Sequence, residues 1–184
     1  MLISRYTKLV SLFVLTFLVF SCNPVHAFTP EWITHYTKGK VKYTEAEKIV
    51  RAVYLYSVKH EVNPNDVFKI IAIESTFNKR AKSKADGRGL MQVVRKWHKD
   101  KINKRDIFDL HVNIDVGTQI YKEYKITYKT QPKALRAYNG SHRSNKYVKK
   151  FNSVKLIDYD EPYPGSDDRP KILYLVTNKQ EDEI

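Results

Sequence analysis

Residues 63–77 read Asn-Pro-Asn-Asp-Val-Phe-Lys-Ile-Ile-Ala-Ile-Glu-Ser-Thr-Phe, a stretch that predicts an amphipathic helix. Asn63 suits the N-cap, Pro64 suits the first helical position, and an aspartate in the first turn interacts favourably with the helix dipole. Three apolar residues recur at helical spacing and form one stripe: Val67, Ile70 and Ile71. Glu74 occupies the next position on that stripe, where a core-facing apolar residue is expected.

A glutamate on a buried helix face needs a physical explanation. Burying an ionised carboxylate costs several kcal/mol unless the group is paired or neutral. Glu74 is therefore either salt-bridged or held protonated in a cleft. A snorkelling or salt-bridged side chain is the ordinary interpretation of a lone glutamate. The protonated alternative describes a general acid.

Three later segments favour the general acid. Residues 89–92 read Gly-Leu-Met-Gln, residues 113–121 read Asn-Ile-Asp-Val-Gly-Thr-Gln-Ile-Tyr, and residues 137–140 read Ala-Tyr-Asn-Gly. Taken in order with the Glu-Ser pair at 74–75, they resemble the catalytic domain of soluble-type lytic transglycosylases, which share a fold with goose-type lysozymes. The resemblance covers residues 63 to about 150. It implies an all-α, lysozyme-like domain that binds the glycan strands of peptidoglycan.

The resemblance also assigns roles to individual residues. Glu74 becomes the acid/base, and Ser75 beside it contacts the substrate or braces the carboxylate. The tyrosine at position 138 is expected to point its hydroxyl at Glu74. The residues that the resemblance places in the saccharide site are Ser75, Met91, Gln92, Tyr121, Tyr138 and Asn139. Structural alternatives stay open for Met91 as core filler, for Tyr121 as a core aromatic and for Asn113 as a helix cap.

The reaction implied by the resemblance uses one carboxyl group and no cofactor or metal. The glutamate protonates the leaving glycosidic oxygen, and its carboxylate then takes the proton of the muramoyl C6 hydroxyl, which attacks C1 and leaves a 1,6-anhydro end. Ordinary glycosidases use a second carboxylate. Goose-type lysozymes often carry an aspartate just after the matching segment, where this chain has Val93 and Val94. This difference favours transglycosylation, with Asp86 as the one nearby candidate for a second base.

The pattern along the rest of the chain is helical. A capping box at residues 44–47 predicts a helix that ends near His60. Residues 99–111 look irregular. The other predicted helices run from Leu90 to about His98, from Asn113 to about Tyr128, from Pro132 through Tyr138, and from a cap at Ser144 through Phe151.

The N-terminus has the features of an export signal. Arg5 and Lys8 form a positive segment, and residues 9–20 are apolar but too short to span a membrane comfortably. We favour cleavage after Ala27, which would remove the only cysteine. A lipobox-like alternative would lipidate Cys22 and anchor the protein to a membrane. Either route predicts a location in the periplasm or cell envelope.

Charge divides the remaining chain into a domain and a tail. Residues 28–155 carry 28 Lys plus Arg against 12 Asp plus Glu, a net charge of +16, whereas residues 156–184 carry 3 against 8, a net charge of −5. The acidic, proline-containing tail is typical of an extended linker. No nucleic-acid-binding motif accompanies the basic domain, and an export signal argues against such a partner. A basic surface suits the polyanionic bacterial wall.

Two alternative functions stay open. The first is a hydrolytic lysozyme of the same fold. The second is a wall-binding scaffold in a secretion or conjugation apparatus. Retention of Glu74 together with Gln92 and Tyr138 argues against a scaffold, because loss of function would remove the acid first.

Overall fold

The computed structural model describes residues 28–141 and 143–155. The predicted signal segment, the alternative lipid anchor at Cys22 and the acidic tail of residues 156–184 lie outside these ranges. Across the described ranges, no helix combines the length and the apolar character that a membrane span requires.

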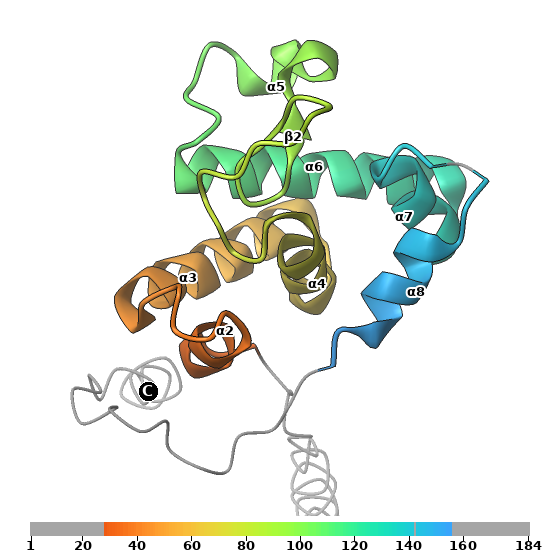
Figure 1. Cartoon of the computed structure of the whole chain (residues 1–184). Helices are drawn as coiled ribbons and strands as arrows, with labels where there is room; N and C mark the ends of the chain where they lie inside the picture. Colours follow the sequence, from red (N-terminus) through yellow and green to blue (C-terminus); the bar gives the residue numbers. More distant parts are fainter. Residues whose placement is uncertain (1–27, 142, 156–184) are drawn as a thin grey trace, which may run out of the picture.

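The described chain is mostly helical, as predicted, with one small antiparallel sheet (Figure 1). The elements, in chain order, are α2 (Pro30–Tyr36), α3 (Tyr43–His60), α4 (Pro64–Ser75), β1 (Gly87–Arg88), β2 (Val93–Val94), the 3-10 helix η1 (Arg95–Trp97), α5 (Lys99–Ile102), α6 (Leu110–Tyr128), α7 (Gln131–Tyr138) and α8 (Lys146–Ser153).

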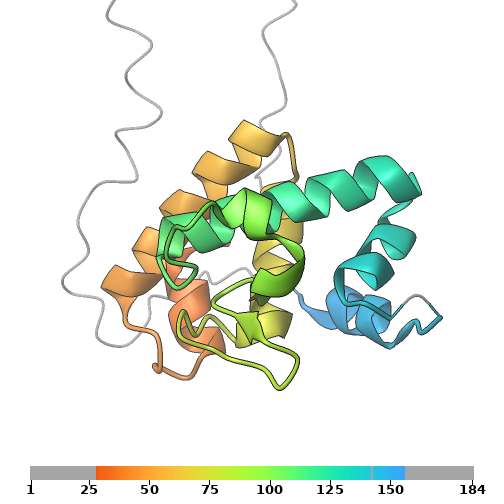
Figure 2. The same cartoon turned by 90° about the horizontal axis from the view of Figure 1, so that it is seen from above.

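Helix α4 lies in the middle of the molecule (Figure 1). Helix α3 packs against α2, α4 and α6, whereas α8 packs against α4 and α7. Helices α7 and α8 therefore flank α4 on the side away from α3, as the view from above also shows (Figure 2). Helices α4 and α8, which are distant in sequence, thus lie in contact with each other.

The predicted start of α4 is confirmed. The Asn63 side chain accepts a hydrogen bond from the backbone N–H of Asn65 at 2.9 Å, and Pro64 occupies the first turn. The apolar stripe is fully buried in the core. At the other end, Thr76 and Phe77 both adopt left-handed backbone conformations, with φ of 50° and 60°. The chain therefore turns away sharply after Ser75, and Glu74 occupies the last turn of the helix.

The helix predicted from Leu90 to about His98 is wrong. Val93 and Val94 form strand β2, which pairs antiparallel with β1, and a single turn of 3-10 helix follows. Two adjacent β-branched residues favour the extended backbone. Gln92, with φ of 49°, is left-handed and prevents a helix from passing through it.

Two predicted helix starts also need correction. Helix α3 begins at Tyr43 with Lys42 as N-cap, so Thr44 lies inside the helix and the predicted capping box does not form. Helix α6 begins at Leu110 rather than Asn113. The Asp109 carboxylate caps α6 by accepting a hydrogen bond from the backbone N–H of Val112 at 2.9 Å.

Helix α2 was not predicted, although its sequence carries the same start signature as α4. Thr29 caps it, Pro30 occupies the first turn, and a glutamate follows. Its aromatic residues join the main core: the Phe28 ring lies 4.7 Å from the Phe68 ring of α4 and 4.6 Å from the Trp32 ring. The segment before α3 is thus an integral part of the packed domain.

Candidate active site

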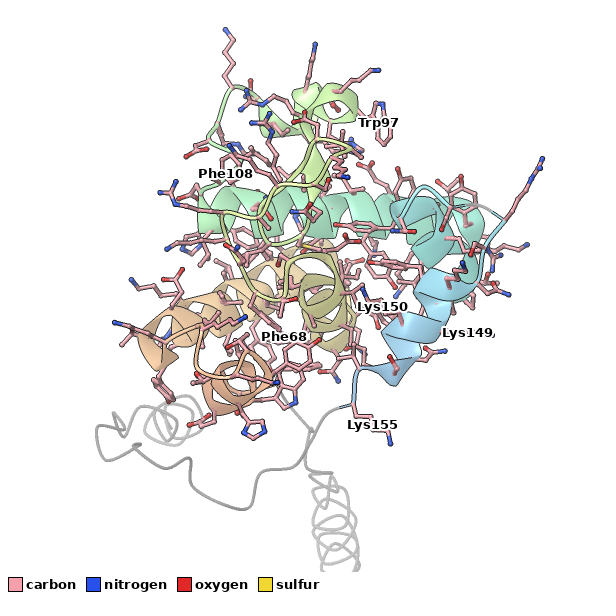
Figure 3. All side chains as sticks on the ribbon, viewed as in Figure 1. Phe68, Trp97, Phe108, Lys149, Lys150 and Lys155 are labelled. Carbon is pink, nitrogen blue, oxygen red and sulfur yellow. The ribbon has the colours of Figure 1, made fainter. Side chains whose placement is uncertain are left out.

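Glu74 lies on the wall of a cavity between α4 and α8. Its Oε1 atom accepts a hydrogen bond of 2.7 Å from the hydroxyl of Tyr147. The cavity has a volume of about 270 Å³. The residues that line it are Ile73, Glu74, Asn139, Lys146, Tyr147 and Lys150. Figure 3 labels Lys150, which lies where α8 faces α4.

Burial raises the pKa of the Glu74 carboxyl group, and this effect exceeds two opposing ones. The hydrogen bond from Tyr147 and the positive charge of Lys150 both lower that pKa, but the net shift is upward. Across residues 28–141 and 143–155, no basic side chain pairs directly with the carboxylate. The geometry therefore shows a half-buried carboxyl group on a cavity wall rather than a salt-bridged one, and burial shifts this group toward its protonated form.

Tyr147 remains a hydrogen-bond donor to Glu74 over a wide pH range. Burial and the nearby Glu74 charge raise the pKa of the Tyr147 hydroxyl well above its ordinary value. The side chain is only 5% exposed and belongs to the inward face of α8. The sequence predicted the helix that carries Tyr147 but not the partner of its hydroxyl, which lies 73 residues away along the chain.

Burial and the nearby Glu74 charge raise the pKa of the Tyr138 hydroxyl, so this hydroxyl lies near Glu74, but it makes no hydrogen bond to the carboxylate. The Tyr138 hydroxyl donates instead to the backbone carbonyl of Met91, at 2.8 Å. Tyr138 therefore braces the segment of residues 89–92 from α7. The hydroxyl that donates to the Glu74 carboxylate belongs to Tyr147 of α8, a helix that packs against α4.

Met91 and Tyr121 are fully buried, so the predicted contacts of these two residues with a saccharide are not supported. The Met91 side chain packs against Gly117, where an added Cβ would lie 2.5 Å from the Met91 sulfur. The Tyr121 hydroxyl donates to Asp66 Oδ2 at 3.1 Å. The alternative of a core role is confirmed for both residues.

Asn113 is a buried clamp rather than a helix cap. Its Oδ1 accepts from the backbone N–H of Met91 at 2.8 Å, and its Nδ2 donates to the carbonyls of Arg88 and Ile107 at 2.9 and 2.8 Å. A Cβ at Gly89 would lie 2.2 Å from that Nδ2, and Gly89 has a φ of +73°. Only glycine fits there.

Gln92 completes the same loop. Its Nε2 donates to the carbonyls of Gly89 and Ala81 at 2.9 and 3.2 Å. These bonds tie residues 89–92 to the basic loop that precedes them. The structure thus places Gln92 in a supporting position, with its side chain partly buried and outside the set of residues that line the Glu74 cavity.

Of the remaining candidate residues, one lines the Glu74 cavity and two make other contacts. Asn139 is exposed and lines the cavity. The Ser75 hydroxyl donates to the Ile71 carbonyl at 3.2 Å rather than to Glu74. Asp86 is exposed and pairs with Arg88 at 2.6 Å, outside the cavity. Glu74 is therefore the one acidic residue among the described residues that line this cavity.

The family model of the transglycosylase SLT domain matches residues 52–159. The chain belongs to this family. No curated protein matches it. Members of the family are lytic transglycosylases that act on peptidoglycan, outside the cytoplasm. The match includes Glu74 and Tyr147, whereas α2 precedes it. The mostly helical structure fits the predicted lysozyme-like fold.

Within the part of the chain that the structure describes, no three His, Cys, Asp or Glu side chains gather as a metal site would require.

Proposed function

We propose that this protein cleaves the MurNAc-β-1,4-GlcNAc bond of peptidoglycan as a lytic transglycosylase, with Glu74 as its sole acid/base. The observation that carries the proposal is a partly buried glutamate whose pKa is raised, on the wall of a cavity to which no other described carboxylate contributes. Membership of the SLT family supports the same substrate class.

The first chemical step is protonation of the leaving oxygen. Because Tyr147 donates to Oε1 of Glu74, we assign the acidic proton to Oε2. Transfer of that proton to the glycosidic oxygen breaks the bond to C1 and releases the GlcNAc hydroxyl. The hydrogen bond donated by Tyr147 and the positive charge of the nearby Lys150 then stabilise the Glu74 carboxylate that remains.

The second step returns the proton. The Glu74 carboxylate takes the proton of the C6 hydroxyl of the same muramoyl residue as that oxygen attacks C1, which closes the 1,6-anhydro ring. No water enters the product, and Glu74 recovers its starting state. Positioning of one group for both transfers requires a fixed carboxyl, and the hydrogen bond from the buried Tyr147 hydroxyl provides this fixation.

Around the acid, Asn139 is the best-placed residue to bind an acetamido group. It lines the cavity and has an exposed side chain, while the Ser141 hydroxyl donates to its Oδ1 at 2.8 Å and orients the amide. Ser75, next to Glu74, also remains a candidate contact. Export by the N-terminal segment would bring this site to the wall, and the basic domain would be attracted to the polyanionic polymer.

Product analysis tests the reaction type. Digestion of isolated sacculi in water labelled with heavy oxygen should release muropeptides with 1,6-anhydro ends and without label. Labelled reducing ends would instead show hydrolysis, and the lysozyme alternative would replace the proposal. A purified chain that releases no muropeptides would favour the scaffold alternative.

A further inference from the structure

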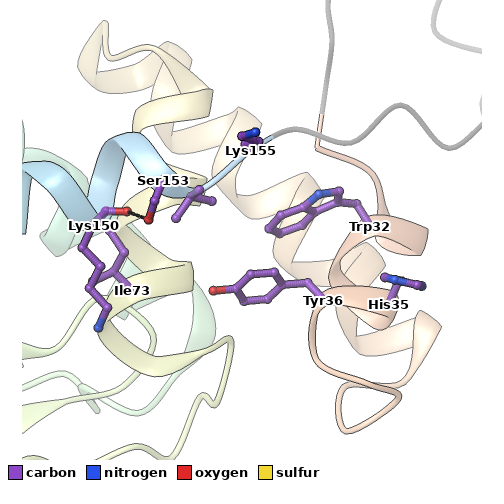
Figure 4. Close-up of a pocket in the computed structure, with 8 residues that line it drawn as sticks. Trp32, His35, Tyr36, Ile73, Lys150, Ser153 and Lys155 are labelled. Carbon is purple, nitrogen blue, oxygen red and sulfur yellow. Dashed lines mark hydrogen bonds between the residues drawn. The ribbon is translucent and has the colours of Figure 1, made fainter.

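A second cavity, of about 380 Å³, lies between α2 and α8 (Figure 4). The residues that line it are Trp32, His35, Tyr36, Ile73, Lys150, Ser153, Val154 and Lys155. Two of them, Ile73 and Lys150, also line the cavity that contains Glu74. The two cavities therefore adjoin each other, and the second one lies on the side of Ile73 and Lys150 that faces α2.

An aromatic pair forms the α2 wall of this second cavity. The Tyr36 and Trp32 rings are stacked, with centroids 4.7 Å apart and planes inclined by 15°. Phe77 meets the Tyr36 ring edge-on at 5.9 Å. Trp32 is only 3% exposed, whereas Tyr36 is 39% exposed. Tyr36 is thus a rigidly supported ring that remains accessible, and Figure 4 shows it extending across the cavity toward α4 and α8.

A supported aromatic ring of this kind suits the apolar face of a pyranose. The ring offers a flat apolar surface, and its hydroxyl provides a polar group at the edge. Because neighbouring aromatic rings already hold Tyr36, little conformational entropy is lost when a ligand binds. No carboxylate lines this cavity among the described residues, whereas Lys150 and Lys155 do. An anionic wall polymer fits that charge pattern.

We propose that Tyr36 forms a saccharide subsite that binds a sugar of the same glycan strand at a distance from the bond that Glu74 cleaves. The proposal rests on the function proposed above. It assigns a role to α2, which precedes the segment matched by the family model. Contacts that are equal in the ground state and the transition state lower KM and leave kcat unchanged. Tyr36 would thus select long strands over short ones.

Binding to oligosaccharides of increasing length tests the subsite. The Glu74→Gln chain, which retains the cleft without the acid, is titrated calorimetrically with chitobiose through chitohexaose. We expect affinity to rise with length. Adding Tyr36→Ala should weaken binding of the longest oligomer about five- to tenfold and leave that of the shortest oligomer that binds within about twofold. Tyr36→Phe, which keeps the ring, should retain the length dependence.

Tyr36→Leu separates the subsite from a folding defect. Leucine keeps apolar volume against Trp32 but has no flat ring, so it should lose long-oligomer affinity as alanine does, with an unchanged melting temperature. Equal losses at every length, or no loss at any length, would overturn the subsite, as would failure of every oligomer to bind. The wild-type chain's release of anhydro-muropeptides from sacculi reports separately on the proposed function.

Discussion

The α4–α8 contact and the loop of residues 89–92 differ in what they do for the site. Both belong to the segment matched by the family model. The loop carries a motif visible in the sequence, yet its residues mainly hold the framework: Gly89 and Met91 are buried and pack against Asn113 of α6. The groups that act directly on Glu74 are Tyr147 and Lys150 of α8. Sequence motifs can thus mark the framework of a site rather than the groups that tune its chemistry.

The largest expected effect is that of Glu74→Gln. The amide is nearly isosteric but cannot act as an acid, so the rate of muropeptide release from sacculi should fall about 10²- to 10⁴-fold. Asp86→Asn is the matched control, since Asp86 is exposed, pairs with Arg88 and lies outside the cavity. That control should retain most of its activity. Wild-type lysis by Glu74→Gln, or complete inactivity of Asp86→Asn, would refute the single-carboxyl mechanism.

Disruption of the loop of residues 89–92 should lower the stability of the fold rather than act on the chemistry of Glu74. Asn113→Ala removes the partners of one buried N–H and two carbonyls, and each unsatisfied buried group costs about 1–3 kcal/mol. We expect a loss of about 3 kcal/mol in the free energy of unfolding, measured by urea denaturation. Asn139→Ala, at an exposed position, serves as the control and should lose less than about 0.5 kcal/mol. Similar losses for both variants would show that Asn113 is not a clamp.

The sequence revealed features that depend on one segment of the chain and missed those that depend on contacts between distant segments. Helix α4 and its buried stripe follow from a cap, a proline and a periodic pattern within a single segment. Helix α2 carries the same local signature and was therefore predictable. The role of Tyr147 was not, because its partner lies 73 residues away and the relevant helix packing is absent from any local pattern. Tyr138 and Tyr147 both have a hydroxyl that needs a hydrogen-bond acceptor. Only the packing of α7 and α8 determines that Tyr138 donates to the Met91 carbonyl and Tyr147 to the Glu74 carboxylate.

Tyr147→Phe should change the pH dependence of the reaction. The Tyr147 hydroxyl lowers the pKa of Glu74, so its removal should raise that pKa further. A general acid works only while it is protonated, and the decline of kcat/KM at high pH should therefore move to higher pH. Loss of carboxylate stabilisation after proton transfer should also lower kcat about tenfold. The measurement is a pH profile of muropeptide release.

Tyr138→Phe is the control for that experiment. Its hydroxyl donates to the Met91 carbonyl and not to Glu74, so its removal should cost about 1 kcal/mol of stability and leave the position of the profile unchanged. If Tyr138→Phe shifted the profile and Tyr147→Phe did not, the assignment of the two tyrosines would be reversed.

The smallest expected effect is on the pH dependence of the free energy of unfolding. This measurement tests the burial of Glu74 separately from its role in the reaction. Its pKa in the folded protein lies above the ordinary value of 4.5, so between these two values the folded state binds more protons than the unfolded state. The contribution of Glu74 to stability is therefore fully present below about pH 4.5 and is lost as pH rises through the folded-state pKa. Glu74→Gln does not titrate and should escape this loss. The free energy of unfolding of Glu74→Gln, measured relative to wild type by urea denaturation across this range, should accordingly increase with pH. A constant difference would mean that Glu74 is not desolvated, and the physical basis for its acidity at the site would fail.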